Sequence, residues 1–182
     1  SKSALKILQT AENLFNEQGF VGVGVDIIRD KSGCSKTTMY TYYQNKTQLI
    51  KSVLLHRDKQ FQNSLIEYIG EDHGLAAIEK ILEWHQQWFL KEDFRGCLFV
   101  RAVSELRHQD EDVIQISKQH KMQIKQLILK NCQHFKDPIL IGELIYTLIE
   151  GLIAIYSIES EIDKDDLNQR FNMIKQHIRN FI

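Results

Sequence analysis

The stretch VDIIRDKSGCSKTTMYTYYQNKTQL, residues 25–49, carries the signals for two short helices, a tight turn and the start of a third helix. Gly33 stands where a helix C-terminus favours a residue that tolerates positive φ, and Ser35 stands where an N-cap is wanted. Met39 and Tyr43 are four residues apart, so they can share the buried side of the second helix. The residues left to face outward are Lys36, Thr37, Tyr40 and Tyr42.

This pattern is typical of a helix-turn-helix unit, whose second helix enters the major groove of DNA. The N-terminus of that helix presents free N–H groups and a positive dipole end to phosphate. Lys and Thr side chains can contact base edges or phosphates, and Tyr hydroxyls can bond phosphate oxygens. A helical hairpin of a bundle with a solvated polar face is the alternative interpretation of the same pattern.

The run GCSKTTMYTYYQNKTQLI, residues 33–50, closely resembles the signature of the TetR family of bacterial DNA-binding regulators. The upstream AENLFNEQGF, residues 11–20, is similar to the family's first helix and its end. With Ser35 as the N-cap, we expect base-edge or adjacent contacts from Lys36, Thr37 and Tyr40. The expected phosphate contacts come from Thr38, Tyr42 and Lys46. Positions that match the family pattern are Gly33, Ser35, Thr38, Tyr40, Tyr42, Lys46 and Leu49.

Two features depart from the family pattern. Val23 and Gly24 stand where the family usually has Thr or Ser as a cap and phosphate ligand, which puts that contact in doubt. Thr37 stands where many members have Gly, so its side chain is free to add a base contact of its own.

Composition places the chain among mostly helical proteins with one or two domains. It has 182 residues with a single proline and few glycines. The three cysteines are widely spaced, which favours a reducing cytoplasm over a disulfide framework. We expect no metal site and no cofactor, because the seven histidines share no short spacing. We also expect no membrane association, because Glu143 and Glu150 interrupt the longest apolar tract, residues 139–158.

Charge is unevenly distributed along the chain. Residues 1–59 hold nine Lys/Arg against five Asp/Glu, an excess of +4, whereas residues 60–182 hold fourteen against nineteen, an excess of −5. A cationic head on an acidic body concentrates positive potential where phosphate would dock.

Helical periodicity extends through the whole chain. We therefore predict an all-α fold of about nine helices, with a three-helix DNA-binding head at 1–45 and a helical effector-binding and dimerisation domain at 46–182. A connecting helix spans 46–69. The other helices are expected at about 3–18, 74–91, 95–108, 110–134 and 138–159, with the last one beginning after Asp163.

The last two predicted helices carry more apolar surface than a small domain can bury. We predict that they meet their copies across a two-fold axis, with Gly151 allowing close approach; a place in the monomer core is the alternative. The TetR resemblance also implies a homodimer. The predicted interface residues are Leu144, Leu148, Gly151, Ile155, Phe171, Ile174 and Ile178.

The resemblance also implies a small-molecule effector pocket in the body. The residues that could line it combine aromatic walls with a few polar groups; aromatic core packing and an Arg101–Glu105 pair on a wet face are the alternatives. Cys97, in a Gly-Cys-Leu-Phe run found in some TetR-like bodies, is a possible sensor thiol. The candidate pocket residues are Trp84, His85, Trp88, Phe99, Arg101, Glu105, Tyr146 and Glu150.

Together these features predict a cytoplasmic, homodimeric regulator that binds a palindromic double-stranded DNA operator. It is expected to be a repressor that a small-molecule effector releases. No arrangement of residues typical of a catalytic site is evident, so we do not expect an enzyme. The alternative is a helical ligand-binding or scaffold protein with a vestigial DNA-binding head.

Overall fold

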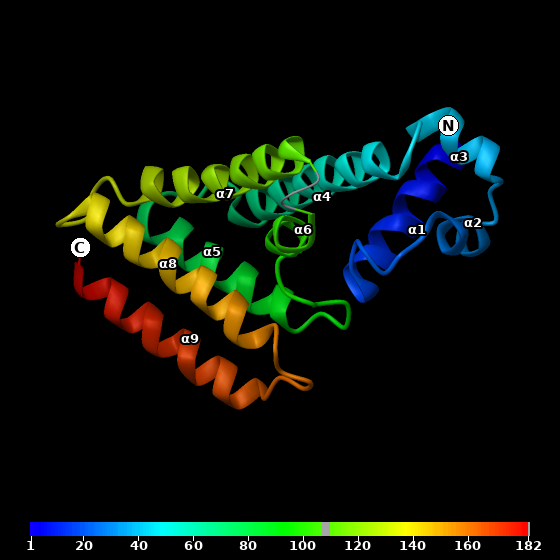
Figure 1. Ribbon diagram of the computed structural model, residues 1–182. Helices are drawn as coiled ribbons and strands as arrows, with labels where there is room; N and C mark the ends of the chain where they lie inside the picture. The colour runs from blue at the N-terminus through cyan, green and yellow to red at the C-terminus, as the bar shows by residue number, and fades with distance from the viewer. Residues whose placement is uncertain (107–109, 182) are drawn as a thin grey trace. The chain divides into compact units, whose positions relative to one another are not determined.

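The computed structural model describes residues 1–106 and 110–181, and within these ranges its regular elements are all helical. The predicted all-α class is confirmed, with nine α-helices in the described part of the chain (Figure 1). The helices are α1 (Lys2–Gln18), α2 (Val25–Ser32), α3 (Lys36–Tyr43), α4 (Lys46–Ile69), α5 (Gly74–Phe89), α6 (Leu98–Leu106), α7 (Glu111–Asn131), α8 (Pro138–Tyr156) and α9 (Lys164–Ile178), followed by a short 3₁₀-helix η1 (Arg179–Phe181).

The chain divides into two compact units. The first comprises Ser1–Phe61 and Leu98–His120, and the second comprises Gln62–Cys97 and Lys121–Ile182. Helices α4 and α7 each contribute to both units. The first unit therefore contains α6 and the part of α4 up to Phe61 as well as the three-helix head. The domain boundary predicted between residues 45 and 46 stays a prediction.

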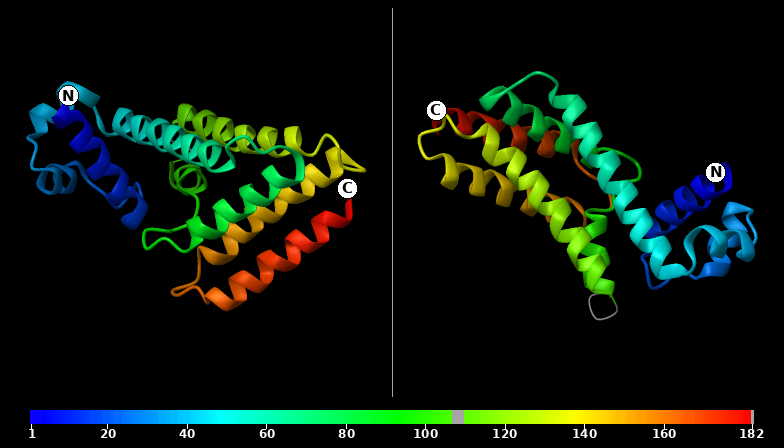
Figure 2. Two further views of the ribbon diagram at one scale, coloured as in Figure 1. Left: turned by 180° about the vertical axis from the view of Figure 1, so that it is seen from behind. Right: turned by 90° about the horizontal axis from the view of Figure 1, so that it is seen from above.

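The head forms because α1 has apolar residues at helical spacing. Its side chains Ile7, Ala11 and Phe15 are fully buried, and α1 contacts both α2 and α3 (Figure 2). The Phe15 ring stacks on Phe20 with the ring centroids 4.9 Å apart. Gly19 ends the helix at φ +85°, a conformation that other residues rarely adopt.

A buried carboxylate fixes α1 to α4 within the first unit. Glu12 is 6 % exposed, and its two oxygens lie 3.1 Å from His56 Nδ1 and 3.0 Å from Arg57 Nη1. A carboxylate buried this deeply requires such partners, because an unpaired charge away from water is very costly. The middle of α4 is thereby attached to the head.

The second unit is built on an aromatic core. Helix α5 packs against both α8 and α9, and the ring of Phe89 lies 5.4 Å from Tyr156 and 6.0 Å from Phe171 between centroids. The last two helices begin at side-chain caps: Asp137 accepts from Leu140 N–H, and Asp163 accepts from two N–H groups of the first turn.

Helix α8 is the one helix in the described ranges that has the length and apolar composition to cross a membrane. Core helices of soluble proteins also meet that test.

Candidate DNA-binding surface

The turn between α2 and α3 has the geometry that its sequence predicts. Gly33 adopts φ +63°, in the left-handed region, and its N–H bonds to Arg29 O to end α2. Ser35 caps α3, because its hydroxyl accepts a hydrogen bond from Thr38 N–H at 3.0 Å. One apolar residue from each helix, Ile28 and Met39, is buried beneath the turn. The local sequence thus sets both the end of one helix and the start of the next.

Helix α3 presents a polar face to solvent. Tyr40 and Tyr42 are each 44 % exposed, although both carry large aromatic rings. Lys36 and Thr37 are also exposed at its N-terminus, while Thr38 is half-buried and shares a 2.8 Å hydrogen bond with Ser35. The residues predicted to contact bases therefore lie together on one accessible helix face.

The lysine of this face is paired within the protein. Lys36 Nζ lies 2.8 Å from Asp26 Oδ1, which also lies 2.7 Å from Arg29 Nη1. The hydrogen bond from Lys36 is the main cause that holds the pKa of Asp26 below its usual value. This carboxylate links α2 to the start of α3 and partly neutralises the cation that would face DNA.

Tyrosines of α3 also bond to α1 and the residue that precedes it. The Tyr43 hydroxyl donates to Ala4 O at 2.7 Å, and the Tyr42 hydroxyl donates to Ser1 Oγ at 2.8 Å. Burial raises the pKa of Tyr43, so its hydroxyl stays protonated and able to donate. Helix α3 is thereby fixed against α1 rather than standing free.

The N-terminal domain matches a known family in sequence. Residues 7–53 match the family model of the bacterial regulatory proteins of the tetR family. These residues extend from α1 through α3 to the first part of α4. Residues 7–53 are a TetR-family DNA-binding domain. No curated protein matches the chain.

The fold of the whole chain is that of TetR-family transcriptional regulators. A TetR-family regulator from Streptomyces coelicolor is 20 % identical, covers 100 % of this chain and 96 % of its own, and superposes with a TM-score of 0.85. Reduced NemR from E. coli is 19 % identical, with 100 % and 97 % covered and a TM-score of 0.80. A cysteine mutant of the TetR-family regulator CifR, solved with 26-bp operator DNA, is 16 % identical, with 97 % and 95 % covered and a TM-score of 0.79.

The two departures from the TetR pattern have clear structural counterparts. Helix α2 begins at Gly24, which has no side chain to cap it, and Val23 is fully buried. The side-chain contact that Thr or Ser would supply is therefore absent at this helix start. Thr37, by contrast, is exposed on the TetR-type recognition face, and its carbonyl accepts from the Thr41 hydroxyl at 2.8 Å.

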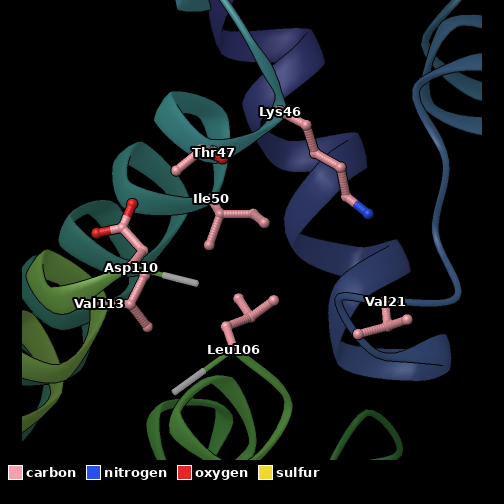
Figure 3. A pocket seen from close by; sticks show the side chains of 7 residues that line it. All are labelled: Val21, Lys46, Thr47, Ile50, Leu106, Asp110 and Val113. Carbon is pink, nitrogen blue, oxygen red and sulfur yellow. The ribbon is translucent and has the colours of Figure 1, made fainter. Parts of the chain in front are cut away.

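Lys46 occupies a different environment from the other predicted contact residues. Its side chain extends from the start of α4 toward Val21, along a small cleft in the first unit (Figure 3). Burial lowers the pKa of Lys46, and the nearby negative charge of Glu105 opposes that effect. Reaching a phosphate would require this side chain to leave the cleft.

Arg101 and Glu105, predicted as pocket residues, instead bind the end of α1. Glu105 Oε2 accepts from the N–H groups of Phe20 and Val21, at 2.7 and 2.9 Å. Arg101 donates to Glu105 Oε1 at 2.8 Å and to Asn16 O at 3.0 Å. We call this arrangement the α6 clamp. The predicted i, i+4 pairing of the two side chains is present, but the sequence did not reveal its backbone partners.

The other predicted pocket residues fall into two groups. Trp84, His85 and Trp88 are buried in the core of the second unit, and Phe99 stacks on the His120 ring at 3.7 Å in the first. Trp84 donates to Ser64 Oγ at 3.0 Å, and His85 Nδ1 lies 2.7 Å from Ile81 O. These four residues therefore pack as the aromatic core that was the alternative interpretation.

Tyr146, Glu150 and Cys97 come together around a residue that the sequence analysis missed. Lys121 Nζ lies 2.7 and 2.6 Å from the two Glu150 oxygens, and Cys97 is close enough to act on Lys121 electrostatically. Burial favours the neutral amine, but Cys97 and Glu150 outweigh it and raise the pKa of Lys121. Burial, followed by the charge of Glu150, raises the pKa of Tyr146. We call these four residues the Lys121 cluster. Lys121 gave no signal because its partners lie far away in sequence.

The predicted dimer interface is only partly at the surface. Leu144, Leu148 and Ile155 are 47, 44 and 43 % exposed on α8, and a side chain added at Gly151 would meet open space. Phe171 and Ile178 are instead 0 and 4 % exposed, and Ile174 is half-buried. The correction has a simple cause: the four-three spacing of α9 faces the core of its own unit, where Phe171 contacts Phe89.

Exposed apolar residues and a groove mark the surface of α8 and α9. The groove has a volume of about 360 Å³, and its lining is almost wholly apolar. Met173 and Phe181 on its α9 side are 54 and 41 % exposed. Apolar patches of this kind on a soluble protein indicate a contact surface. The lining residues are Ile141, Leu144, Ile145, Leu148, Met173, Ile174, His177, Ile178 and Phe181.

Proposed function

We propose that this protein is a cytoplasmic, homodimeric transcriptional regulator that binds a near-palindromic DNA operator through α3. The observation that carries the proposal is the exposed face of α3, with Lys36, Thr37 and Tyr40 displayed at a Ser35-capped helix start. Such a helix fits the major groove, and its polar side chains suit base edges. Phosphate contacts are assigned to Thr38, Tyr42 and Lys46.

In a homodimer, the two heads would bind the same operator. The exposed leucines of α8 and the apolar groove beside α9 support a two-fold contact between copies, in which Gly151 allows the backbones to approach. Two recognition helices on one face of DNA require half-site centres about 34–36 Å apart. A conformational change that alters the distance between the two heads could therefore abolish operator binding without altering α3 itself.

We assign effector sensing to the Lys121 cluster in the second unit. It contains an ammonium, a carboxylate, a phenol and a thiol among apolar helices, and ligand sites combine a few polar groups with apolar walls in this way. An effector that stabilises a conformation with wrongly spaced heads would act as an inducer, and the protein would be a repressor. To shift the ratio of the two conformations from 1:99 to 99:1, the effector must bind the favoured conformation more tightly by about 5.5 kcal/mol.

Selection from random DNA duplexes tests this function. Purified full-length protein should enrich a near-palindrome with half-sites one helical turn apart, and an excess of scrambled duplex should not displace it. Equal affinity for scrambled and selected DNA would instead favour the alternative, a helical ligand-binding protein with a vestigial head. A small-molecule screen for release of the selected duplex would then identify the effector.

A further inference from the structure

A cleft in the first unit is lined by Lys46 together with both apolar and polar side chains. Its volume is about 150 Å³, and Figure 3 shows Ile50, Leu106 and Val113 facing its centre. Val21 lies at the end toward which Lys46 extends. Among the residues that the structure describes, the lining is Val21, Lys46, Thr47, Ile50, Leu106, Asp110 and Val113.

The lysine in this cleft has no ion-pair partner in residues 1–106 and 110–181, since no carboxylate there lies within 4.0 Å of its Nζ. Asp110, on the opposite wall, is occupied by Lys51 at 3.0 Å. Glu105 is close enough to act on Lys46 through its charge, but its oxygens already accept from Arg101 and two backbone N–H groups. The Lys46 ammonium is therefore partly buried and available to an anion that enters the cleft.

The size and chemistry of the cleft define what would complete it. A cavity of about this volume can hold a benzene ring. Ile50, Leu106 and Val113 offer apolar contacts, and because Asp110 is paired with Lys51, the charge left without an ion pair among the described lining residues is the positive one of Lys46. We propose that the cleft binds a small monocarboxylate about the size of benzoate, with the carboxylate on Lys46 Nζ and the hydrocarbon against Ile50, Leu106 and Val113.

This ligand would compete directly with DNA for Lys46, a consequence that rests on the proposed function. The same ammonium is assigned to phosphate, and it cannot bind a carboxylate in the cleft and a phosphate on DNA at once. Loss of one phosphate contact from each head would lower the salt-dependence slope of DNA binding by about 1.8. The cleft is separate from the Lys121 cluster, so it would be a second regulatory site.

Calorimetric titration of the full chain with sodium benzoate, in the absence of DNA, tests the site. Wild-type protein should bind benzoate at least tenfold more tightly than the Lys46→Gln variant, and at least tenfold more tightly than it binds neutral benzyl alcohol. Lys118→Gln, which changes an exposed lysine on α7, should leave benzoate binding unchanged. Absent binding to wild type, or equal binding to Lys46→Gln, would overturn the proposal.

A second variant fills the cleft without removing the charge. Val21 is 63 % exposed, so Val21→Trp should fold normally, as circular dichroism can verify, while its indole occupies the end of the cleft beside the Lys46 ammonium, where the carboxylate would bind. It should bind benzoate at least tenfold more weakly than wild type. Unchanged affinity would contradict the assigned position.

Titration of the selected duplex separates this proposal from the proposed function. Benzoate should weaken DNA binding and flatten the salt slope in wild type but have no effect in Lys46→Gln. If benzoate binds through Lys46 but the protein selects no DNA, the cleft stands and the regulator function fails. If the protein selects an operator but benzoate does not bind, the reverse holds.

Discussion

Glu105 holds the backbone of Phe20: its Oε2 accepts the Phe20 N–H at 2.7 Å, immediately beyond the end of α1. Gly19 precedes this contact, and a Cβ built there would lie 2.6 Å from Glu105 Oε1. The absence of a side chain at Gly19 is therefore what lets the α6 clamp close on α1. Movement of α6 would be transmitted to the head through these bonds.

Glu105→Gln should weaken the α6 clamp and lower the free energy of unfolding by about 1 kcal/mol. Hydrogen bonds to a charged acceptor contribute about 1.5–3 kcal/mol, and partial exposure of this side chain reduces that value. Urea denaturation at neutral pH measures the difference. Glu111→Gln, which changes an exposed glutamate in the first turn of α7, is a suitable control and should change stability by less.

The stabilisation by Glu105 should depend on pH. Burial favours the neutral acid, but the Val21 N–H, Arg101 and the Phe20 N–H outweigh it and hold the pKa of Glu105 below its usual 4.5. The contribution is then fully present above about pH 4.5 and is lost as pH falls through the lower folded-state pKa. A wild-type to Glu105→Gln difference that persisted undiminished well below that range would contradict this assignment.

Asp26→Asn should raise affinity for DNA of any sequence several-fold. The substitution removes a negative charge from beside the exposed face of α3 and frees Lys36 from a solvent-exposed ion pair, which contributes little to stability. Fluorescence anisotropy with a scrambled duplex at low salt measures the effect. Asp30→Asn is the matched control, because Asp30 lies on the same helix and pairs with Arg29 as Asp26 does, so that the Lys36 contact of Asp26 is the difference; an equal gain there would show that only net charge matters.

Thr37→Ala should change base preference at one position in each half-site, by about 1–3 kcal/mol per base pair, because the exposed hydroxyl and methyl are lost. Repeating the duplex selection with the variant shows which position relaxes. Thr41→Ala, one turn further along α3, should leave the selected sequence as it is, since that hydroxyl bonds to Thr37 O. An unaltered consensus with Thr37→Ala would remove Thr37 from the base-contacting set.

Leu148→Asp should convert the proposed homodimer to monomer at micromolar concentration. The substitution places a charge on the exposed apolar face of α8, where a partner's contact would have to bury it. Sedimentation velocity reports the assembly state. Ile66→Asp introduces the same charge at a residue that is 55 % exposed on α4, and it should remain dimeric. A dimeric Leu148→Asp protein would place the interface elsewhere.

Cys97 should react with iodoacetamide much faster than Cys132 at neutral pH. Cys97 is partly exposed beside the Lys121 ammonium, whereas burial raises the pKa of the Cys132 thiol to about 11. Mass spectrometry of a Cys34→Ser background follows each site. Lys121→Met should slow the reaction of Cys97 because it removes the adjacent cation. No modification of Cys97 in native protein would exclude it as a sensor thiol.

Local sequence was sufficient for the helices and for the recognition motif. Gly33 and Ser35 set the end of α2 and the start of α3 through bonds to residues within four positions, so neighbouring residues alone specified them. The exposed face of α3 followed from the same periodicity. The helical fold was predictable for this reason, because helical hydrogen bonds and amphipathic spacing are local.

Only the tertiary structure decided which polar residues meet. The α6 clamp joins positions 84 and 85 apart in sequence, and Lys121 meets Glu150 across 29. Periodicity shows that a helix has a buried side, but it does not show which helix covers it, and for this reason Phe171 was assigned to a partner rather than to its own core. Long-range contacts depend on how the helices pack against one another, and that packing also gave Lys46 its cleft.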